Sequence, residues 1–290
     1  MHNNLIILAG GASSRMKKEA NASNLNKEDV AQANTKSKGL IGVGELGLPL
    51  LHYLLYNAKK AGYKNIFIII GEKDSNFQEV YGALEKGNQF NGLSISFARQ
   101  YIPKDRIKPF GTADAVFQTL EQFPELKTQC FTVCNSDNLY SKNALQLLRE
   151  TPERNALLGY DRDVLEYPSE RINRFALMRT DNNNYMVDII EKPHINDVPK
   201  YQDTNGKLRV SMNIFKFDGP QFYPYLKSCP VHPERNEKEI PTALLNMIDD
   251  HGQCIKVLPI AEHVIDLTSK NDIGMVRDYL KDKYPKVLNW

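Results

Sequence analysis

The sequence predicts an α/β protein built around a doubly wound, mostly parallel β-sheet. Short apolar runs alternate with helical patterns over residues 1–150, as in chains where strands and helices take turns. The run "NIFIII" at 65–70 is continuously apolar, which is typical of a parallel strand covered on both faces. With 290 residues, 41% of them hydrophobic, the chain can bury one large core or two modest domains.

The elements of the first half follow from their periodicities. The run "LIILA" at 5–9 is predicted to be a buried strand, whereas the polar stretch 17–37 has almost no large apolar residue and is expected to be an exposed, mobile loop. Apolar residues at helical spacing begin at Leu50, and Gly62 ends that helix. The remaining predictions are strands at 65–70, 93–98 and 130–134, and helices at 112–123 and 143–150.

The second half changes character. Two apolar runs flank the Asn-rich stretch "DNNN" at 181–184, which predicts a β-hairpin inserted after the alternating elements. A capping box, "SKND" at 269–272, is expected to start the final helix. We find no internal repeat and expect one domain over 1–290. The other predictions are a strand at 209–218, a helix at 239–250 and a strand at 254–260.

Composition excludes several classes of protein. The net charge is +2, from 37 basic and 35 acidic residues, so we expect no nucleic-acid partner. The four cysteines lack zinc-ligand spacing and are expected to be reduced thiols. No run approaches the roughly 20 apolar residues of a membrane span, and the short N-terminal apolar run has no basic flank. We therefore expect a cytoplasmic protein with no membrane partner.

The stretch "LAGGASSRM" at 8–16 is the first candidate site. A strand that ends in Gly10 and Gly11 allows backbone amides to point at an anion. It is neither a dinucleotide fingerprint, since Arg15 stands where the third glycine belongs, nor a Walker loop. Alone, it favours a tight turn between a strand and a helix over a phosphate site.

Other polar positions follow strands or open helices, and each has an ordinary structural alternative. Gly111 and Thr112 open a helix, where Thr112 is expected to be an N-cap. Asp137 follows an apolar strand and suits Mg²⁺, although "NSD" is also a good turn. Lys192 ends a strand as a phosphate ligand or a surface lysine, and Asp266 is a second metal ligand or a loop acid.

The order of these motifs resembles the sugar-1-phosphate nucleotidylyltransferases over nearly the whole chain. "LAGGASSRM" is followed by a lysine before an apolar run, here Lys38, and then by "GTA" at 111–113. "SD" at 136–137 resembles the family's metal site, and "IEKP" at 190–193 resembles its EKP element. The last matches are "MNIFKF", "NEKEIPTA" and "VIDLTSK".

The resemblance implies a Rossmann-like, glycosyltransferase-A-like fold with an inserted β-hairpin in the sugar-binding subregion. Residues 1–150 would be the nucleotide-binding half and 151–290 the sugar-phosphate-binding half. The implied reaction transfers a nucleotidyl group from a nucleoside triphosphate to a sugar 1-phosphate, with Mg²⁺, and releases pyrophosphate. A homo-oligomer is compatible with the sequence.

The resemblance also implies a role for each matched residue. The implied metal ligands are Asp137 and Asp266, and the catalytic residues are Arg15, Lys38, Asp137 and Lys192. The nucleotide would be bound by Leu8, Ala9, Gly10, Gly11, Gly111 and Thr112. The sugar phosphate would be bound by Glu191, Lys192, Asn213 and Glu239.

Three departures from the family pattern keep other interpretations open. Ser13 and Ser136 replace usual glycines, and Asn213 stands where a glycine is common. The chain is alternatively a nucleotidylyltransferase for another phosphorylated molecule, such as phosphocholine or a polyol phosphate, or a non-catalytic nucleotide-sugar-binding regulator. An NAD-dependent enzyme is excluded by the missing third glycine and by the lack of a suitably placed acidic residue.

Overall fold

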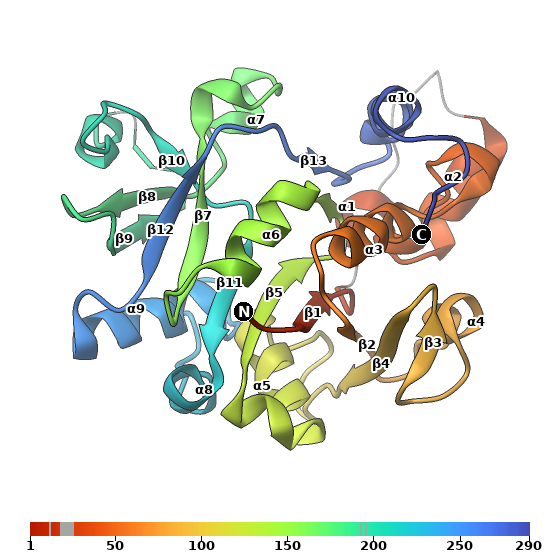
Figure 1. Ribbon diagram of the computed structural model, residues 1–290, viewed down its shortest axis with the longest axis horizontal. Coiled ribbons are helices and arrows are strands. Elements are labelled where there is room, and N and C mark those ends of the chain that lie inside the picture. Colours follow the sequence, from red (N-terminus) through yellow and green to blue (C-terminus); the bar gives the residue numbers. More distant parts are fainter. Residues whose placement is uncertain (12, 18–25, 192, 195) are drawn as a thin grey trace. The chain divides into compact units, whose positions relative to one another are not determined.

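The computed structural model describes residues 1–11, 13–17, 26–191, 193–194 and 196–290, and Figure 1 labels its helices and strands. The chain divides into two compact units. The first, here called the N-terminal unit, comprises Asn3–Pro109, Asn135–Leu145 and Ile265–Trp290. The second, the central unit, comprises Met1–His2, Phe110–Cys134 and Gln146–Val264. One domain with a nucleotide-binding and a sugar-phosphate-binding half stays a prediction.

Parallel strands form the core of the N-terminal unit. β1 (Asn4–Leu8) pairs in parallel with β2 (Asn65–Gly71), and β2 pairs in parallel with β4 (Leu93–Gln100). A short strand, β3 (Asn88–Phe90), adds to β4 in the antiparallel direction. The interiors of β1 and β2 are buried, which explains their continuous apolar runs. Because the three long strands are parallel, their carboxyl ends meet at one edge.

Helices and a small ribbon complete the N-terminal unit. The apolar face of α3 (Leu50–Lys60) is buried, and Gly62 follows it with a φ of +95°, as the sequence predicts. Two short strands, β6 (Asn138–Leu139) and β13 (Ile265–Asp266), pair antiparallel. The other helices are α1 (Ser14–Lys17), α2 (Lys27–Thr35), the 3-10 turns η1 (Lys38–Leu40) and η2 (Glu45–Gly47), α4 (Asn76–Tyr81) and α10 (Asp272–Lys283).

Helix α2 corrects the expectation that 17–37 is an exposed loop. Residues 18–25 lie outside the described residues, but Lys27–Thr35 is helical. Asn26 caps it by accepting the Asp29 amide at 2.8 Å, and Asp29 is paired with Arg277 of α10, Nη2 to Oδ1 2.8 Å. The helix is therefore held by a cap and an ion pair, which an apolar periodicity does not reveal.

The central unit is built mainly from antiparallel strands. Their order is β5 (Cys130–Asn135), β11 (Ile214–Asp218), β7 (Ala156–Asp161), β10 (Arg209–Val210), β8 (Leu177–Thr180) and β9 (Met186–Ile190). β12 (Lys256–Ile260) pairs with β7 in parallel. Its helices include α5 (Thr112–Gln122), α7 (Ser169–Ile172), α8 (Gly219–Lys227) and α9 (Ile240–His251), with α8 packed on both α5 and α9. Helix α6 (Lys142–Glu150) carries the chain across the boundary between the units, and 3-10 turns lie at Pro124–Thr128, Arg162–Val164 and Val198–Tyr201.

Most predicted elements are present, and the α/β class is confirmed. The β8–β9 hairpin has the expected Asn-rich turn, in which Asp181 Oδ1 accepts the Asn183 and Tyr185 amides at 2.9 and 2.8 Å. The prediction of a single strand at 209–218 is wrong, because residues 211–213 separate β10 from β11. Asn213 has a φ of +56°, a left-handed conformation that a strand cannot contain.

The four cysteines, Cys130, Cys134, Cys229 and Cys254, are free thiols, as expected. Burial raises the pKa of the Cys130, Cys229 and Cys254 thiols. Among the described residues, no helix combines the length and apolarity required to cross a bilayer.

We expect the Asp29–Arg277 pair to account for much of the docking of α2. The Asp29 side chain is 6% exposed, so Asp29→Ala should lower the free energy of unfolding by about 1.5–3 kcal/mol, the range for a hydrogen bond to a charged group. Glu28→Ala, at an exposed position of the same helical turn, should cost no more than about 0.5 kcal/mol. Urea denaturation measures both, and equal losses would contradict the ion-pair account.

Candidate functional site

The glycine loop follows β1 at the carboxyl edge of the parallel strands. Ala9 donates its amide to the Ile69 carbonyl at 2.9 Å, which ties the loop to β2. A Cβ at Gly10 would lie 3.3 Å from the Ile70 carbonyl carbon, so only glycine fits there without a shift. Gly11 is exposed with open space around it, and Arg15 lies exposed on α1. Ala12 lies outside the described residues.

Lys38 forms an ion pair with Asp137. Its Nζ donates to Asp137 Oδ2 at 2.7 Å, and the two side chains are 11% and 21% exposed. Close packing holds the next residue, because a Cβ on Gly39 would lie 3.2 Å from the Ser136 Cβ. The segment at 38–39 is therefore pressed against the segment at 136–137. Partial burial strengthens the attraction between the ammonium and the carboxylate by lowering the local dielectric.

The β6–β13 ribbon brings Asp266 to the same place. Asp266 pairs with Asn138, next to Asp137, and the Leu267 amide donates to the Asp137 carbonyl at 2.8 Å. Asp266 Oδ2 also accepts from the Thr268 hydroxyl at 2.7 Å. The structure therefore brings together three of the predicted site residues, at positions 38, 137 and 266. They come from three distant parts of the sequence and lie within one unit.

The turn after Asp266 is held by Asp272. Its Oδ2 accepts the backbone amides of Thr268 at 2.9 Å and Ser269 at 2.6 Å, and the Ser269 hydroxyl at 3.2 Å. The reach from Asp272 back to Ser269 is one half of the predicted capping box. Helix α10 itself begins at Asp272.

The donor set at Asp137 and Asp266 fits a magnesium ion. Mg²⁺ takes oxygen ligands and is held by one or two carboxylates together with substrate phosphates and water. Within the described part of the chain there is no group of three or more His, Cys, Asp or Glu side chains that would form a complete protein cage. Asp137 and Asp266, brought together by the β6–β13 ribbon, would supply two carboxylates to a metal that takes its other ligands from phosphates and water.

Gly111 and Thr112 lie in the central unit against the segment that leads into α9. Gly111 is the N-cap of α5, with a φ of +103°, and a Cβ there would lie 2.3 Å from the Lys238 carbonyl oxygen. The expected N-cap role of Thr112 is therefore wrong. Its hydroxyl accepts the Ile240 amide at 3.1 Å, so it satisfies the start of α9 instead.

Glu191 and Glu239 are joined by Arg235, which the sequence did not single out. The Arg235 guanidinium pairs with the Glu191 carboxylate through one nitrogen and with Glu239 Oε1 at 2.7 Å through another. Glu239 is also the N-cap residue of α9. The spacing of four between Arg235 and Glu239 was a weak signal, but Glu191 is too distant in sequence to be paired by inspection. Lys192 lies outside the described residues.

Asn213 is exposed between β10 and β11, and its amide donates to Ser211 Oγ at 3.3 Å. The predicted residues thus fall into two sets. The N-terminal unit contains Leu8, Ala9, Gly10, Gly11, Arg15, Lys38, Asp137 and Asp266, and the central unit contains Gly111, Thr112, Glu191, Asn213 and Glu239.

Comparison with known proteins places this chain in context. The family model described as Nucleotidyl transferase matches residues 32–284. A UDP-glucose pyrophosphorylase solved with UDP-glucose superposes with a TM-score of 0.70 at 15% identity, covering 98% of this chain and 100% of the other. A proposed glucose-1-phosphate thymidylyltransferase from Bacillus anthracis, in complex with a sucrose, gives 0.67 at 19% identity, covering 96% and 95%. These likenesses confirm the α/β, glycosyltransferase-A-like fold class.

The contact at Gly111 leads to a stability prediction. Gly111→Ala should lower the free energy of unfolding by about 2–4 kcal/mol, since it adds a clash with the Lys238 backbone to the cost of a left-handed residue. Gly206 has a φ of +73° and nothing within 4 Å of its Cβ position, so Gly206→Ala should cost only about 1 kcal/mol. Denaturant titration of both variants is the measurement, and an equal cost would show that the Lys238 contact is unimportant.

Proposed function

The chain belongs to the nucleotidyl transferase family, and from that premise we propose that it transfers a nucleotidyl group from a nucleoside triphosphate to a sugar 1-phosphate, releasing pyrophosphate. The observation that carries the proposal is the Lys38–Asp137 ion pair with Asp266 beside it. One cation and two carboxylates gathered around the turn after β5 and the β6–β13 ribbon suit the binding of phosphates and a divalent metal. The sugar-1-phosphate acceptor is favoured by the names of the two similar structures.

The reaction needs no nucleophile from the protein. An oxygen of the acceptor phosphate forms a bond to the α-phosphorus of the triphosphate, and the bond from that phosphorus to the bridging oxygen breaks. The electron pair of the broken bond leaves with pyrophosphate. Catalysis of such a step rests on alignment and on neutralising the negative charge of the phosphates.

The residues of the N-terminal unit would supply that neutralisation. Asp137 and Asp266 would hold Mg²⁺, which withdraws charge from phosphate oxygens when it is bound. The Lys38 ammonium would donate a hydrogen bond to a phosphate oxygen, and Asp137 Oδ2, its present partner, would become available to the metal. The backbone at Gly10 and Gly11, next to Leu8 and Ala9, would contact the nucleotide, and Arg15 would bind the departing pyrophosphate.

The residues of the central unit would bind the acceptor and part of the nucleotide. Glu191 and Glu239 would accept hydrogen bonds from sugar hydroxyls, with Arg235 fixing both carboxylates. Lys192, matched by the EKP element, is assigned to the acceptor phosphate, and Asn213 is assigned to the sugar. Gly111 and Thr112 are assigned to the nucleotide through the "GTA" match.

Pyrophosphate release tests the proposal. The protein is incubated with Mg²⁺, each common nucleoside triphosphate and a panel of sugar 1-phosphates, phosphocholine and polyol phosphates. We expect release with one base and a sugar 1-phosphate, and a loss of at least about 100-fold in kcat/KM for Asp137→Asn, the size for a key electrostatic group.

The remaining outcomes of this assay separate the alternatives. Release with phosphocholine or a polyol phosphate only would show that the acceptor is that molecule and not a sugar 1-phosphate. Absence of release with every pair, despite thermal stabilisation by Mg²⁺ and a triphosphate, would replace the enzyme with a nucleotide-binding regulator.

Arg235 leads to a second kinetic prediction. Arg235→Gln leaves Glu191 and Glu239 without their shared cation, so the KM for the acceptor should rise about tenfold while the KM for the triphosphate is unchanged, as expected for one lost charged contact. Arg154→Gln removes the pair between the exposed Arg154 and the largely buried Asp218 in the same unit and is the matched control. A change in the triphosphate KM larger than the change in the acceptor KM would contradict the assignment of Glu191 and Glu239 to the sugar.

A further inference from the structure

We propose that Asp74 is a positioning residue for Lys38, acting through Ser37; this inference rests on the proposed function. Ser37 precedes Lys38, and its hydroxyl donates to Asp74 Oδ2 at 3.1 Å. Asp74 lies in the loop between β2 and α4, so the bond joins two loops that are separated by 36 residues in sequence. Both residues are half-buried.

The Ser37–Asp74 bond is one of two anchors around Lys38. The other is Gly39, whose α-carbon packs so closely on Ser136 that a Cβ would meet the Ser136 Cβ at 3.2 Å. Lys38 therefore has a fixed residue on each side. A lysine side chain is long and flexible, so the position of its ammonium depends on how firmly its backbone is held. Two anchors keep the Nζ within reach of Asp137 Oδ2.

The two carboxylate oxygens of Asp74 have different tasks. Oδ1 accepts the Asn76 backbone amide at 3.0 Å and the Asn76 side-chain amide at 2.9 Å, which are local bonds at the start of α4. Oδ2 accepts the Ser37 hydroxyl. The local bonds thus orient the carboxylate, and the remaining oxygen reaches the Lys38 segment.

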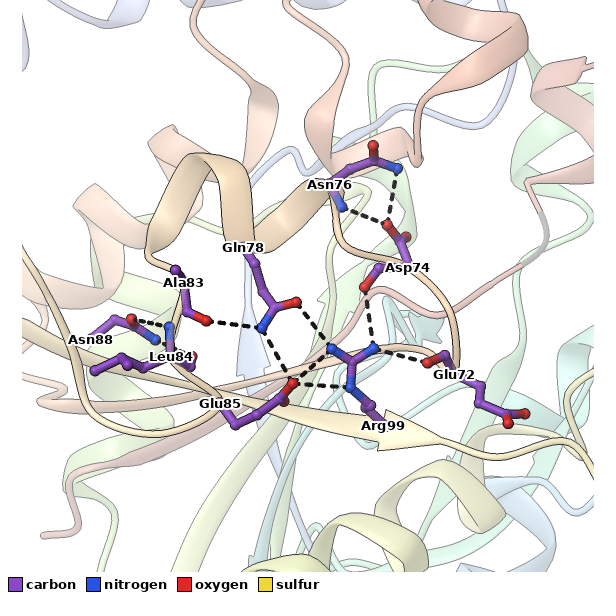
Figure 2. Close-up of polar contacts among 9 residues, drawn as sticks. All are labelled: Glu72, Asp74, Asn76, Gln78, Ala83, Leu84, Glu85, Asn88 and Arg99. Atoms are coloured by element: carbon purple, nitrogen blue, oxygen red, sulfur yellow. Dashed lines mark hydrogen bonds and ion pairs between the residues drawn. The ribbon is translucent and has the colours of Figure 1, made fainter.

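Arg99 makes this loop rigid. Figure 2 shows its guanidinium at the centre of the network, with Nη1 donating to the carbonyl oxygens of Glu72 at 2.8 Å and Asp74 at 3.4 Å. The other donors reach Gln78 Oε1 at 3.0 Å and Glu85 Oε1 at 2.7 and 3.2 Å. Arg99 stands on β4, so the network transmits the rigidity of the parallel strands to the loop that holds Ser37.

The same loop also begins where the glycine loop packs. Gly10 lies against the Ile70 carbonyl carbon and the Gly71 amide, at Cβ distances of 3.3 and 3.4 Å, and the Asp74 amide donates to the Gly71 carbonyl at 3.1 Å. The end of β2 thus contacts the glycine loop, and the β2–α4 loop that follows it contacts Ser37, the residue before Lys38. This placement gives Asp74 a role beyond its own turn.

Selective acylation of lysines tests the proposal without any turnover. The intact protein is treated with acetic anhydride, and the modification rate of Lys38 is measured by mass spectrometry against exposed Lys281. Ser37→Ala and Asp74→Ala should each accelerate acylation of Lys38 about threefold to tenfold, the factor that one hydrogen bond represents. Ser37→Thr keeps the hydroxyl and should restore the wild-type rate.

Ser75→Ala is the matched control, because Ser75 is in the same loop and its side chain caps nothing. It should leave the Lys38 rate unchanged. Should Ser37→Ala and Asp74→Ala also leave it unchanged, with circular dichroism showing the native fold, the proposal is overturned. If Asp74→Ala does not fold, Ser37→Ala and its Ser37→Thr rescue decide alone.

Kinetics supply the second arm. Ser37→Ala should lower kcat about threefold to tenfold with little change in the triphosphate KM, and should have no further effect in a Lys38→Ala background, since both changes act through one group. An additive loss in the double variant would contradict the positioning role. If the wild type turns over no substrate pair, the proposed function fails, whereas the acylation result still decides whether Asp74 positions Lys38.

Discussion

The contact between the Lys38 ammonium and the Asp137 carboxylate is the interaction on which the proposed site of the N-terminal unit depends. Either charge alone, mostly withdrawn from water, would be costly, and together they offset each other. The fold brings them together by three devices: the close packing of Gly39 on Ser136, the β6–β13 ribbon, and the bond from Ser37 to Asp74. In the proposed reaction, a metal would take the place of the Lys38 ammonium at Asp137, and phosphates would take the place of the carboxylate at Lys38.

In the central unit, the corresponding feature is a pair of carboxylates, Glu191 and Glu239, that lie close to the same arginine. Arg235 bridges Glu191 and Glu239, so its positive charge offsets part of the repulsion between the two carboxylates. The start of α9 is held by the Thr112 hydroxyl, which accepts the Ile240 amide, and by the close contact of Gly111 with Lys238. The residues matched by "GTA" thus support the helix that begins after Glu239, and this local task exists whatever the substrate is.

Patterns along the sequence predicted the parallel strands and the order of the motifs, because these depend on short-range periodicity. The strand β7 was not predicted, although "ALLGYD" is an apolar run that a closer count would have found. Helix α2 was missed because an ion pair with Arg277, about 250 residues away, replaces an apolar face. The break at Asn213 and the bridge at Arg235 depend on a backbone conformation and on a distant partner. The resemblance named Lys38, Asp137 and Asp266, but only the fold could bring them together.

The central claim is that the chain transfers the α-phosphorus of a nucleoside triphosphate to an acceptor phosphate. Phosphorus-31 NMR of the reaction mixture tests it most directly, with a sugar 1-phosphate as acceptor. The account predicts that the acceptor resonance moves into a new, coupled diphosphate pair as pyrophosphate appears in equal amount. Release of orthophosphate, or of pyrophosphate together with free nucleoside monophosphate and an unchanged acceptor, would indicate hydrolysis and contradict it.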